Sequence, residues 1–103
     1  MRQAEVALHG VVAGHLIEEE PGRRYRFAYV AGYEGPPVSL TLSVRTEPYD
    51  FEEFPAFFDG LLPEGFQLEA LLRQKKLDRD DPFGQLIAVG ADTVGAVTVR
   101  EVP

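Results

Sequence analysis

Residues 57–66 read FFDGLLPEGF: two phenylalanines and two leucines, then a Pro-Glu-Gly corner and a third phenylalanine, Phe66. Apolar side chains at this density are costly to leave in water, so the segment predicts the seam on which a small hydrophobic core closes. Aromatic residues and leucines at helical spacing are typical of core packing, which we expect for the residues before the corner. On a helical wheel Phe66 lies about 160° from Leu68, so it either folds back onto the core or projects away from it.

The chain length predicts one domain over residues 1–103. Area scaling allows about 65% of the surface of the extended chain to be buried, enough for a modest core. Cysteine is absent, which excludes disulfides and thiolate metal sites. No apolar run approaches the ~20 residues that cross a bilayer, and no signal peptide is recognisable at the start. We therefore expect no membrane association and a cytoplasmic location.

The charge balance is acidic, with 17 acidic and 10 basic residues and a net charge of −7. Affinity for nucleic acids depends on Lys and Arg side chains that neutralise phosphates, so we expect no direct nucleic-acid binding. The negative charge either steers a basic partner surface towards the chain or only keeps the protein in solution.

Five segments show the pattern of β-strands. Residues 4–8 and 11–17 predict a hairpin, because His9-Gly10 between them fits a two-residue turn. Period-two alternation predicts further strands from Arg24 to Tyr29 and from Val38 to Val44, followed by a connector over 46–50. A last strand is expected from 94 to 102. The acidic triplet 18–20 is interpreted as a solvated strand end.

Three helices are expected after the fourth strand. The first has an apolar face from Phe51 to Leu62, with its start left open by two or three residues because Pro55 must fall in the first turn. The second covers about 66–76, with an inward stripe of leucines. The third begins at Asp81 as N-cap and ends before Gly90. The predicted fold is α+β: a small antiparallel β-sheet, partly barrel-like, with three short helices packed on it.

No constellation of reactive side chains accompanies this fold. Nucleophilic catalysis needs Cys, or Ser or Thr beside a base, and the histidines His9 and His15 lie at the tip and in the middle of the first hairpin, too far apart to form a pair. The run 81–84 (DPFG) differs from the Asp-Phe-Gly motif of kinases by an inserted proline, and Asp81 is interpreted as a helix cap. We therefore predict no catalytic residue, no cofactor and no metal, and a protein that works by binding.

Four motifs in order carry a family resemblance: PVSLTL at 37–42, FFDGLLPE at 57–64, DPF at 81–83 and GADTVGAV at 90–97. Together with the opening hairpin, they make nearly the whole chain similar to the N-terminal subdomain of HipA-type serine/threonine kinases, which are toxins of bacterial toxin–antitoxin systems. None of the ATP-binding or catalytic motifs of the kinase falls within the chain.

The resemblance implies a role as a binding protein. In split systems a short protein of this kind, HipS, is encoded apart from the kinase HipT, beside the helix-turn-helix protein HipB. Resemblance to HipS implies an antitoxin that binds and neutralises the kinase, with HipB as a further member of the complex. In this family the residue after Pro-Glu-Gly is often a larger aromatic than Phe66. We expect the contact to be formed by the corner and the residues before it: Phe66, Gly65, Glu64, Pro63, Leu62 and Leu61.

Two alternatives remain open at the level of sequence. The chain could be a structural subunit that completes a split kinase, or supports its contact with HipB, without inhibiting it. It could also be a domain cut from a longer kinase.

Overall fold

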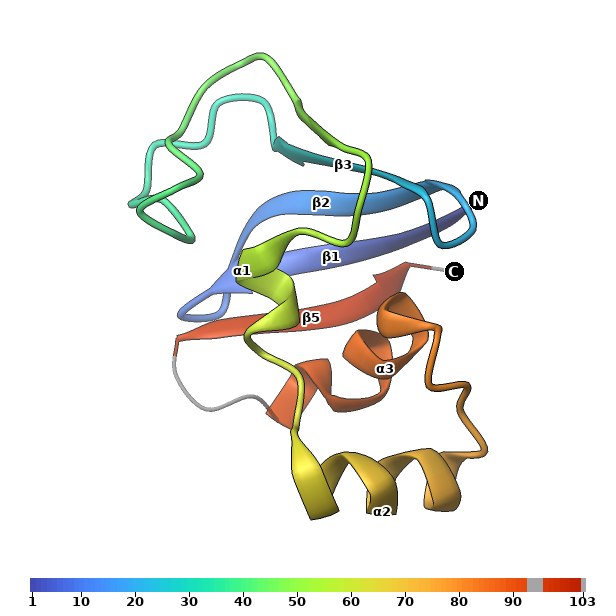
Figure 1. The fold of residues 1–103 in the computed structure, drawn as a ribbon. Coiled ribbons are helices and arrows are strands. Elements are labelled where there is room, and N and C mark those ends of the chain that lie inside the picture. Colours follow the sequence, from blue (N-terminus) through green and yellow to red (C-terminus); the bar gives the residue numbers. More distant parts are fainter. Residues whose placement is uncertain (93–95, 103) are drawn as a thin grey trace.

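The computed structural model describes residues 1–92 and 96–102, which form a five-stranded antiparallel sheet with three helices on one of its faces (Figure 1). The strand order is β4-β3-β2-β1-β5. The elements are β1 (Arg2–Leu8), β2 (Val11–Glu20), β3 (Arg24–Tyr29), β4 (Tyr49–Phe51), α1 (Ala56–Asp59), α2 (Gly65–Lys75), α3 (Pro82–Val89), the 3-10 turn η1 (Gly90–Asp92) and β5 (Val97–Val102). The α+β class is confirmed. The expected partly barrel-like character is not observed: the sheet is open, because its edge strands β4 and β5 do not pair with each other.

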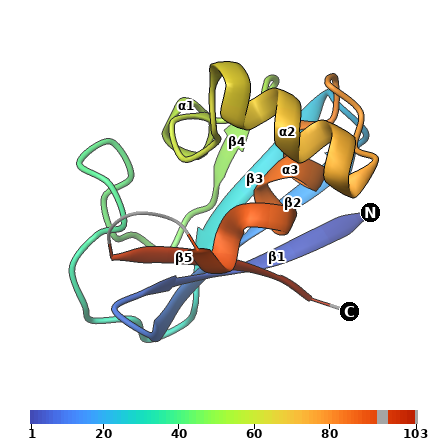
Figure 2. The ribbon, with the colours of Figure 1, turned by 90° about the horizontal axis from the view of Figure 1, so that it is seen from below.

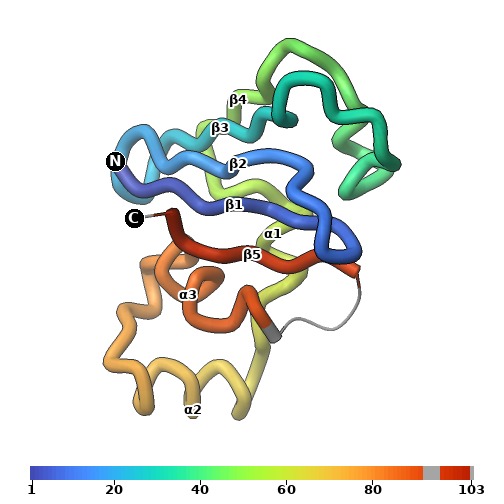
Figure 3. Tube along the Cα trace, turned by 180° about the vertical axis from the view of Figure 1, so that it is seen from behind, coloured from blue at the N-terminus to red at the C-terminus, as the bar shows by residue number. Residues whose placement is uncertain are grey.

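The helices form two successive layers over the sheet. Helices α1 and α3 lie against the strands, and α2 lies beyond α3, away from the sheet (Figures 1 and 2). Seen from behind, the other face of the sheet carries no helix from the described residues (Figure 3). Since α2 packs on α3 rather than on a strand, no residue of this fully described helix is buried.

The expected hairpin and the alternating third strand are both observed. The turn between β1 and β2 places His9 and Gly10 at φ 51° and 81°, the left-handed conformations that a two-residue turn requires. In β3, Tyr25, Phe27 and Tyr29 are buried, while the residues between them face the other side of the sheet. The aromatic face of β3 thereby supplies the middle of the core.

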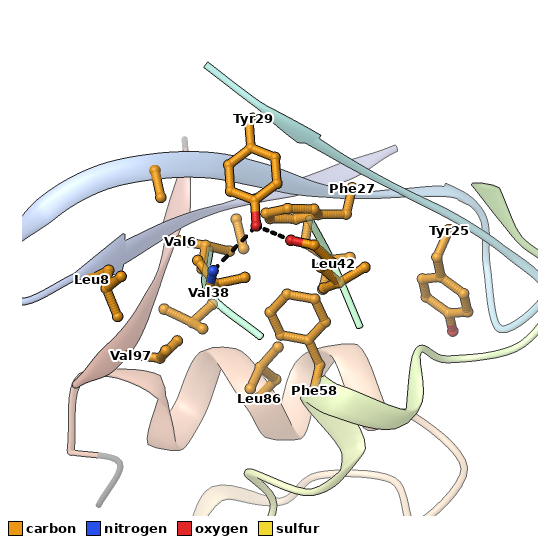
Figure 4. Close-up of a cluster of buried hydrophobic side chains, with 14 of the residues drawn as sticks. Val6, Leu8, Tyr25, Phe27, Tyr29, Val38, Leu42, Phe58, Leu86 and Val97 are labelled. Atoms are coloured by element: carbon orange, nitrogen blue, oxygen red, sulfur yellow. Dashed lines mark hydrogen bonds between the residues drawn. The ribbon is translucent and has the colours of Figure 1, made fainter. Parts of the chain in front are cut away.

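The core forms where this aromatic face meets the helices. Phe58 of α1 and Leu86 of α3 are fully buried and point towards the sheet (Figure 4). The ring centroids of Phe27 and Phe58 lie 5.7 Å apart, within the usual range for an aromatic pair. The prediction that the segment before the Pro-Glu-Gly corner closes the core is confirmed for Phe58, and Phe57 packs against the cluster from its edge.

The predicted fourth strand over 38–44 is wrong, and these residues form a folded loop. Val38 and Leu42 are buried whereas Leu40 is completely exposed, so the apolar positions do not share one face. The Tyr29 hydroxyl holds the loop: it accepts a hydrogen bond from the Val38 N–H (3.1 Å) and donates one to the Leu42 carbonyl (Figure 4). The fourth strand is instead Tyr49–Phe51, part of which was expected to be a connector.

The first helix is much shorter than predicted. It covers only Ala56–Asp59, and Pro55 is the N-cap rather than a residue of the first turn. Phe51 belongs to β4, and Phe54 lies before the helix, where its ring packs edge-on against Tyr25 at 5.3 Å. Their spacing resembled a helical stripe because the chain bends at residues 52 and 53, and both side chains then pack against the same core.

The second and third helices agree with the prediction. In α3 the Asp81 carboxylate accepts a hydrogen bond from the Gly84 N–H (3.1 Å), and Pro82 is the first helical residue. Helix α2 begins one residue earlier than expected. The last strand is confirmed from Val97 to Val102, and its predicted start at 94–95 lies outside the described residues.

The interpretation of 18–20 as a solvated strand end is wrong for Glu18, which is 3% exposed. The Arg2 guanidinium lies between two carboxylates. It donates to both oxygens of Glu18 (2.9 Å each) and to both oxygens of Asp81 (2.7 and 3.1 Å). These bonds lower the pKa of Asp81, and the two carboxylates raise that of Arg2. This cluster, called the Arg2 clamp below, joins both strands of the hairpin to the start of α3.

Candidate partner-binding surface

The chain between α1 and α2 is anchored at its beginning. The Leu61 N–H donates to the Phe58 carbonyl and the Leu62 N–H to the Asp59 carbonyl, both at 3.1 Å, so two tight turns end α1. Leu61 and Leu62 are half-buried and pack against the core cluster. These two predicted contact residues therefore mainly support the corner.

The corner itself depends on Gly65. Glu64 has extended backbone (φ −128°, ψ 164°), and Gly65 then adopts φ +58°, which reverses the chain into α2. A left-handed conformation of this kind is accessible to glycine at little cost and is unfavourable for other residues. An added Cβ on Gly65 would meet no atom within 4 Å, so the requirement for glycine comes from the backbone alone.

Phe66 projects into solvent, with 94% of its surface exposed. On the helical wheel it shares the outward face of α2 with Ala70 and Arg73, which are also exposed. The leucines of the predicted inward stripe, Leu68 and its neighbours one turn on, are half-buried on the α3 side. Of the two orientations that the sequence left open, the structure has the projecting one.

Together the six predicted residues form a graded surface, called the Phe66 corner below. Leu61, Leu62 and Pro63 are half-buried at its base, and Glu64, Gly65 and Phe66 are exposed at its tip. The arrangement presents an aromatic ring on a backbone held by turns at one end and by a helix at the other. An apolar socket on another molecule could receive this ring. The six residues do not place an acid, a base and a nucleophile next to one another.

Titratable groups elsewhere do not form a reactive site in the part of the chain that the structure describes. No group of three or more potential metal ligands is found there. His9 is exposed at the hairpin tip, and His15 is half-buried within β2. Burial raises the pKa of the Tyr25 phenol, and the nearby Glu18 carboxylate adds to this effect. Both effects come from packing around the Arg2 clamp.

Two exposed apolar features escaped the sequence reasoning. Leu40 is completely exposed at the tip of the folded loop. An open hollow of about 430 Å³ lies between the β1–β2 turn and the loop after β3, lined mainly by apolar residues that include Leu8, Val12 and Tyr33. Because the pattern over 38–44 alternates, the sequence predicted that Leu40 would be buried in a strand. The hollow is formed by residues 8–12 and 30–36, which are about twenty residues apart in the sequence, so no local pattern indicates it. Among the described residues, no helix has the length and apolar character of a membrane span.

The fold and surface define a small α+β domain with an open antiparallel sheet and an exposed aromatic corner. The chain belongs to the HipA N-terminal domain family, whose pattern it matches over residues 4–100. It is 30% identical to an uncharacterized protein of Haemophilus influenzae over 101 residues, which cover 98% of this chain and 93% of that protein. Among solved structures it is similar to the N-terminal domain of HipA toxin. The TM-score is 0.78 at 26% identity, with 100% of this chain and 94% of the other covered. The resemblance read from the four motifs is thus confirmed.

Proposed function

We propose that this chain is a non-catalytic antitoxin that binds a HipA-like serine/threonine kinase toxin and neutralises it. The kinase is the separately encoded toxin of a split system, HipT, in the cytoplasm, and a HipB-type helix-turn-helix protein is a further member of the complex. Membership of the HipA N-terminal domain family supports a HipA-type partner. The observation that carries the proposal is the projection of Phe66 from the corner with 94% of its surface exposed.

An aromatic ring in this position favours association for two reasons. Burying a phenylalanine side chain contributes about 1.5–3 kcal/mol, and aromatic residues at the centre of an interface commonly contribute 2 kcal/mol or more. The turns at Leu61 and Leu62 and the helix that begins at Gly65 already order the backbone on both sides of the ring. Little conformational entropy is then lost on binding.

The test is a titration of the purified chain against the HipA-type kinase encoded beside it, with wild type compared with Phe66→Ala. We expect the dissociation constant to rise at least ~30-fold, which corresponds to about 2 kcal/mol, and the rescue of growth from the kinase to be lost. The unfolding midpoint should stay unchanged because the ring packs on nothing in the free chain.

The matched control is Leu40→Ala. Leu40 is also completely exposed, and its loop lies at the opposite end of the molecule from α2 (Figure 1). We expect this variant to bind and rescue like wild type. If wild type, Phe66→Ala and Leu40→Ala all bind the kinase with equal affinity, the Phe66 corner is not part of the interface. If the wild-type chain forms no complex with the kinase, the proposal itself is rejected.

A second candidate follows from the likeness to the N-terminal domain of HipA toxin, which is a domain of the toxin itself. In this alternative the chain is a structural subunit that completes a split kinase, or its contact with HipB, without inhibiting it. Phosphorylation by the kinase, measured with and without the chain, separates the two: neutralisation predicts a fall in activity on addition, and completion predicts a rise.

A further inference from the structure

We infer that the surface receiving Phe66 is an apolar socket flanked by lysine or arginine side chains, and that Asp59 and Glu64 steer it onto the Phe66 corner. The inference rests on the proposed function for the identity of the partner, a HipA-type kinase. The inference adds two points: the chemical character of the partner's surface, and the attraction between opposite charges as the cause of fast association.

The net charge of the chain falls, in the sequence, within the stretch that contains the corner. Residues 46–72 contain seven acidic residues and no basic residue, which equals the whole net charge of −7. The remainder of the chain balances, with ten acidic and ten basic residues. The seven are Glu47, Asp50, Glu52, Glu53, Asp59, Glu64 and Glu69. The same 27 residues include Phe66, so the exposed ring is carried on the acidic part of the protein.

Two of these acids form ion pairs within the chain. Asp50 accepts a hydrogen bond from Arg26 at 2.7 Å, and Glu69 pairs with Arg79. These two carboxylates present a dipole rather than an isolated charge to an approaching partner. Glu52 and Glu53 line one shallow hollow together with Arg23 and Arg24, and both arginines form ion pairs with Glu20.

Asp59 and Glu64 are the two unpaired acids that lie nearest to Phe66 along the chain. Both are exposed, and neither carboxylate has an ion pair or a hydrogen bond to another described residue; Glu64 is the N-cap of α2 but does not use its side chain to cap it. They bracket the connector that leads to Phe66. Five residues of chain span at most about 18 Å, which is within the width of a standard interface of about 800 Å² per partner. One interface can therefore cover the ring and both charges.

Steering acts on the rate of association more than on the final affinity. Complementary charges beside a docking site raise the association rate constant at low ionic strength, and the effect fades as the Debye length shrinks to about 3 Å near 1 M salt. Burial of the ring, in contrast, controls mainly the dissociation rate. The two contributions of the Phe66 corner can thus be separated kinetically.

The experiment measures association and dissociation of the purified chain with the catalytically inactivated kinase by stopped-flow mixing, at low and at high salt. The variant Asp59→Asn/Glu64→Gln removes these two charges. Its matched control, Glu34→Gln/Glu101→Gln, removes two exposed acids outside the acidic stretch. We expect the first variant to associate roughly 3–10-fold more slowly at low salt and to match wild type at high salt, and the control to stay within about twofold.

Each outcome separates the inference from the proposed function. An association rate that is independent of salt, or an equal fall in both double variants, would overturn the basic socket while leaving the kinase as partner. Absence of binding by the wild-type chain at every salt concentration would reject the proposed function. A chain that dimerises alone through these two carboxylates, using the basic end of α2 on a second copy, would also overturn the inference; gel filtration of both variants detects it.

Discussion

Replacing Arg2 with methionine should lower the free energy of unfolding by about 2–3 kcal/mol at neutral pH, through loss of the Arg2 clamp. Glu18 is 3% exposed, so its carboxylate would remain buried without the guanidinium that now donates to both of its oxygens. Breaking a fully buried ion pair costs roughly 3–5 kcal/mol. Because the Arg2 side chain is 36% exposed, water compensates part of this cost, which gives the lower figure.

Methionine is chosen because it preserves packing. The Arg2 side chain passes over the Phe83 ring, with its guanidinium carbon 5.0 Å from the centroid. An unbranched apolar side chain keeps contact with that ring, so the variant removes mainly the charge. The double variant Arg2→Met/Glu18→Met should recover at least about 1 kcal/mol relative to the single one, since it leaves no buried charge on Glu18.

The assay is urea unfolding followed by circular dichroism, with Arg100→Met as the control. Arg100 also pairs with a strand carboxylate, Glu5, at 2.8 Å, but its side chain is 77% exposed. A surface pair of this kind contributes about 0–1 kcal/mol. If Arg2→Met and Arg100→Met cost the same, burial of Glu18 does not strengthen the clamp and the reasoning above fails.

Three further predictions concern single positions. Gly65→Ala should cost about 1 kcal/mol because of its positive φ, whereas Gly60→Ala, at φ −65°, should cost much less; thermal unfolding compares them, and equal midpoints would contradict the assigned conformation. Tyr29→Phe should cost about 1–3 kcal/mol, because it leaves a buried N–H and a buried carbonyl of the folded loop without their partner, and faster amide exchange at 38–42 should accompany it. The Arg2 hydrogen bonds lower the pKa of Asp81 below its ordinary 3.8, so its contribution to stability is present above that value and is lost as the pH falls through the lower folded value. Asp81→Asn should therefore destabilise at pH 7 and approach wild type as the pH falls below 3.8; a constant difference from pH 7 down through this range would refute the linkage.

Elements with local signals were predictable from the sequence. The third helix has its cap and its N1 proline in adjacent residues, and both act through adjacent backbone. Gly90, expected just past its end, has an ordinary right-handed φ of −61°, and a Cβ there would lie 2.2 Å from the Val99 carbonyl oxygen of β5, so this glycine is required by a distant strand. The strand Arg24–Tyr29 has a uniform aromatic face, and the hairpin turn needs only His9-Gly10. The family resemblance added the order of the elements. Apart from Gly90, these features depend little on partners far along the chain.

Features set by distant residues were not predictable. The alternation over 38–44 was typical of a strand, but the Tyr29 hydroxyl binds two backbone groups of this segment and folds it into a loop. Glu18 is buried because Arg2 and Asp81, 16 residues before it and 63 after it, meet at one end of the sheet. The periodicity of a segment depends only on residues close together in the sequence. It therefore indicates neither the loop over 38–44 nor the burial of Glu18.

The candidate site lies between these cases. The helical wheel gave the direction of Phe66 relative to Leu68, but exposure also depends on whether anything lies beyond α2. The arrangement of layers decides this: α2 packs on α3 with its outer side free (Figure 2). Tertiary structure was therefore needed to choose between a buried and a projecting ring.

Because α2 lies outside the core, the residues that determine folding and the residues that face a partner occupy different positions in the sequence. Side chains that face outward from this helix touch neither the sheet nor the buried cluster, so substitutions there leave the core intact. Across a family of such domains, partner choice can therefore diverge through the outer face of α2 while the folded scaffold stays the same. Under the proposed function, two domains with the same sheet can thus recognise different kinases.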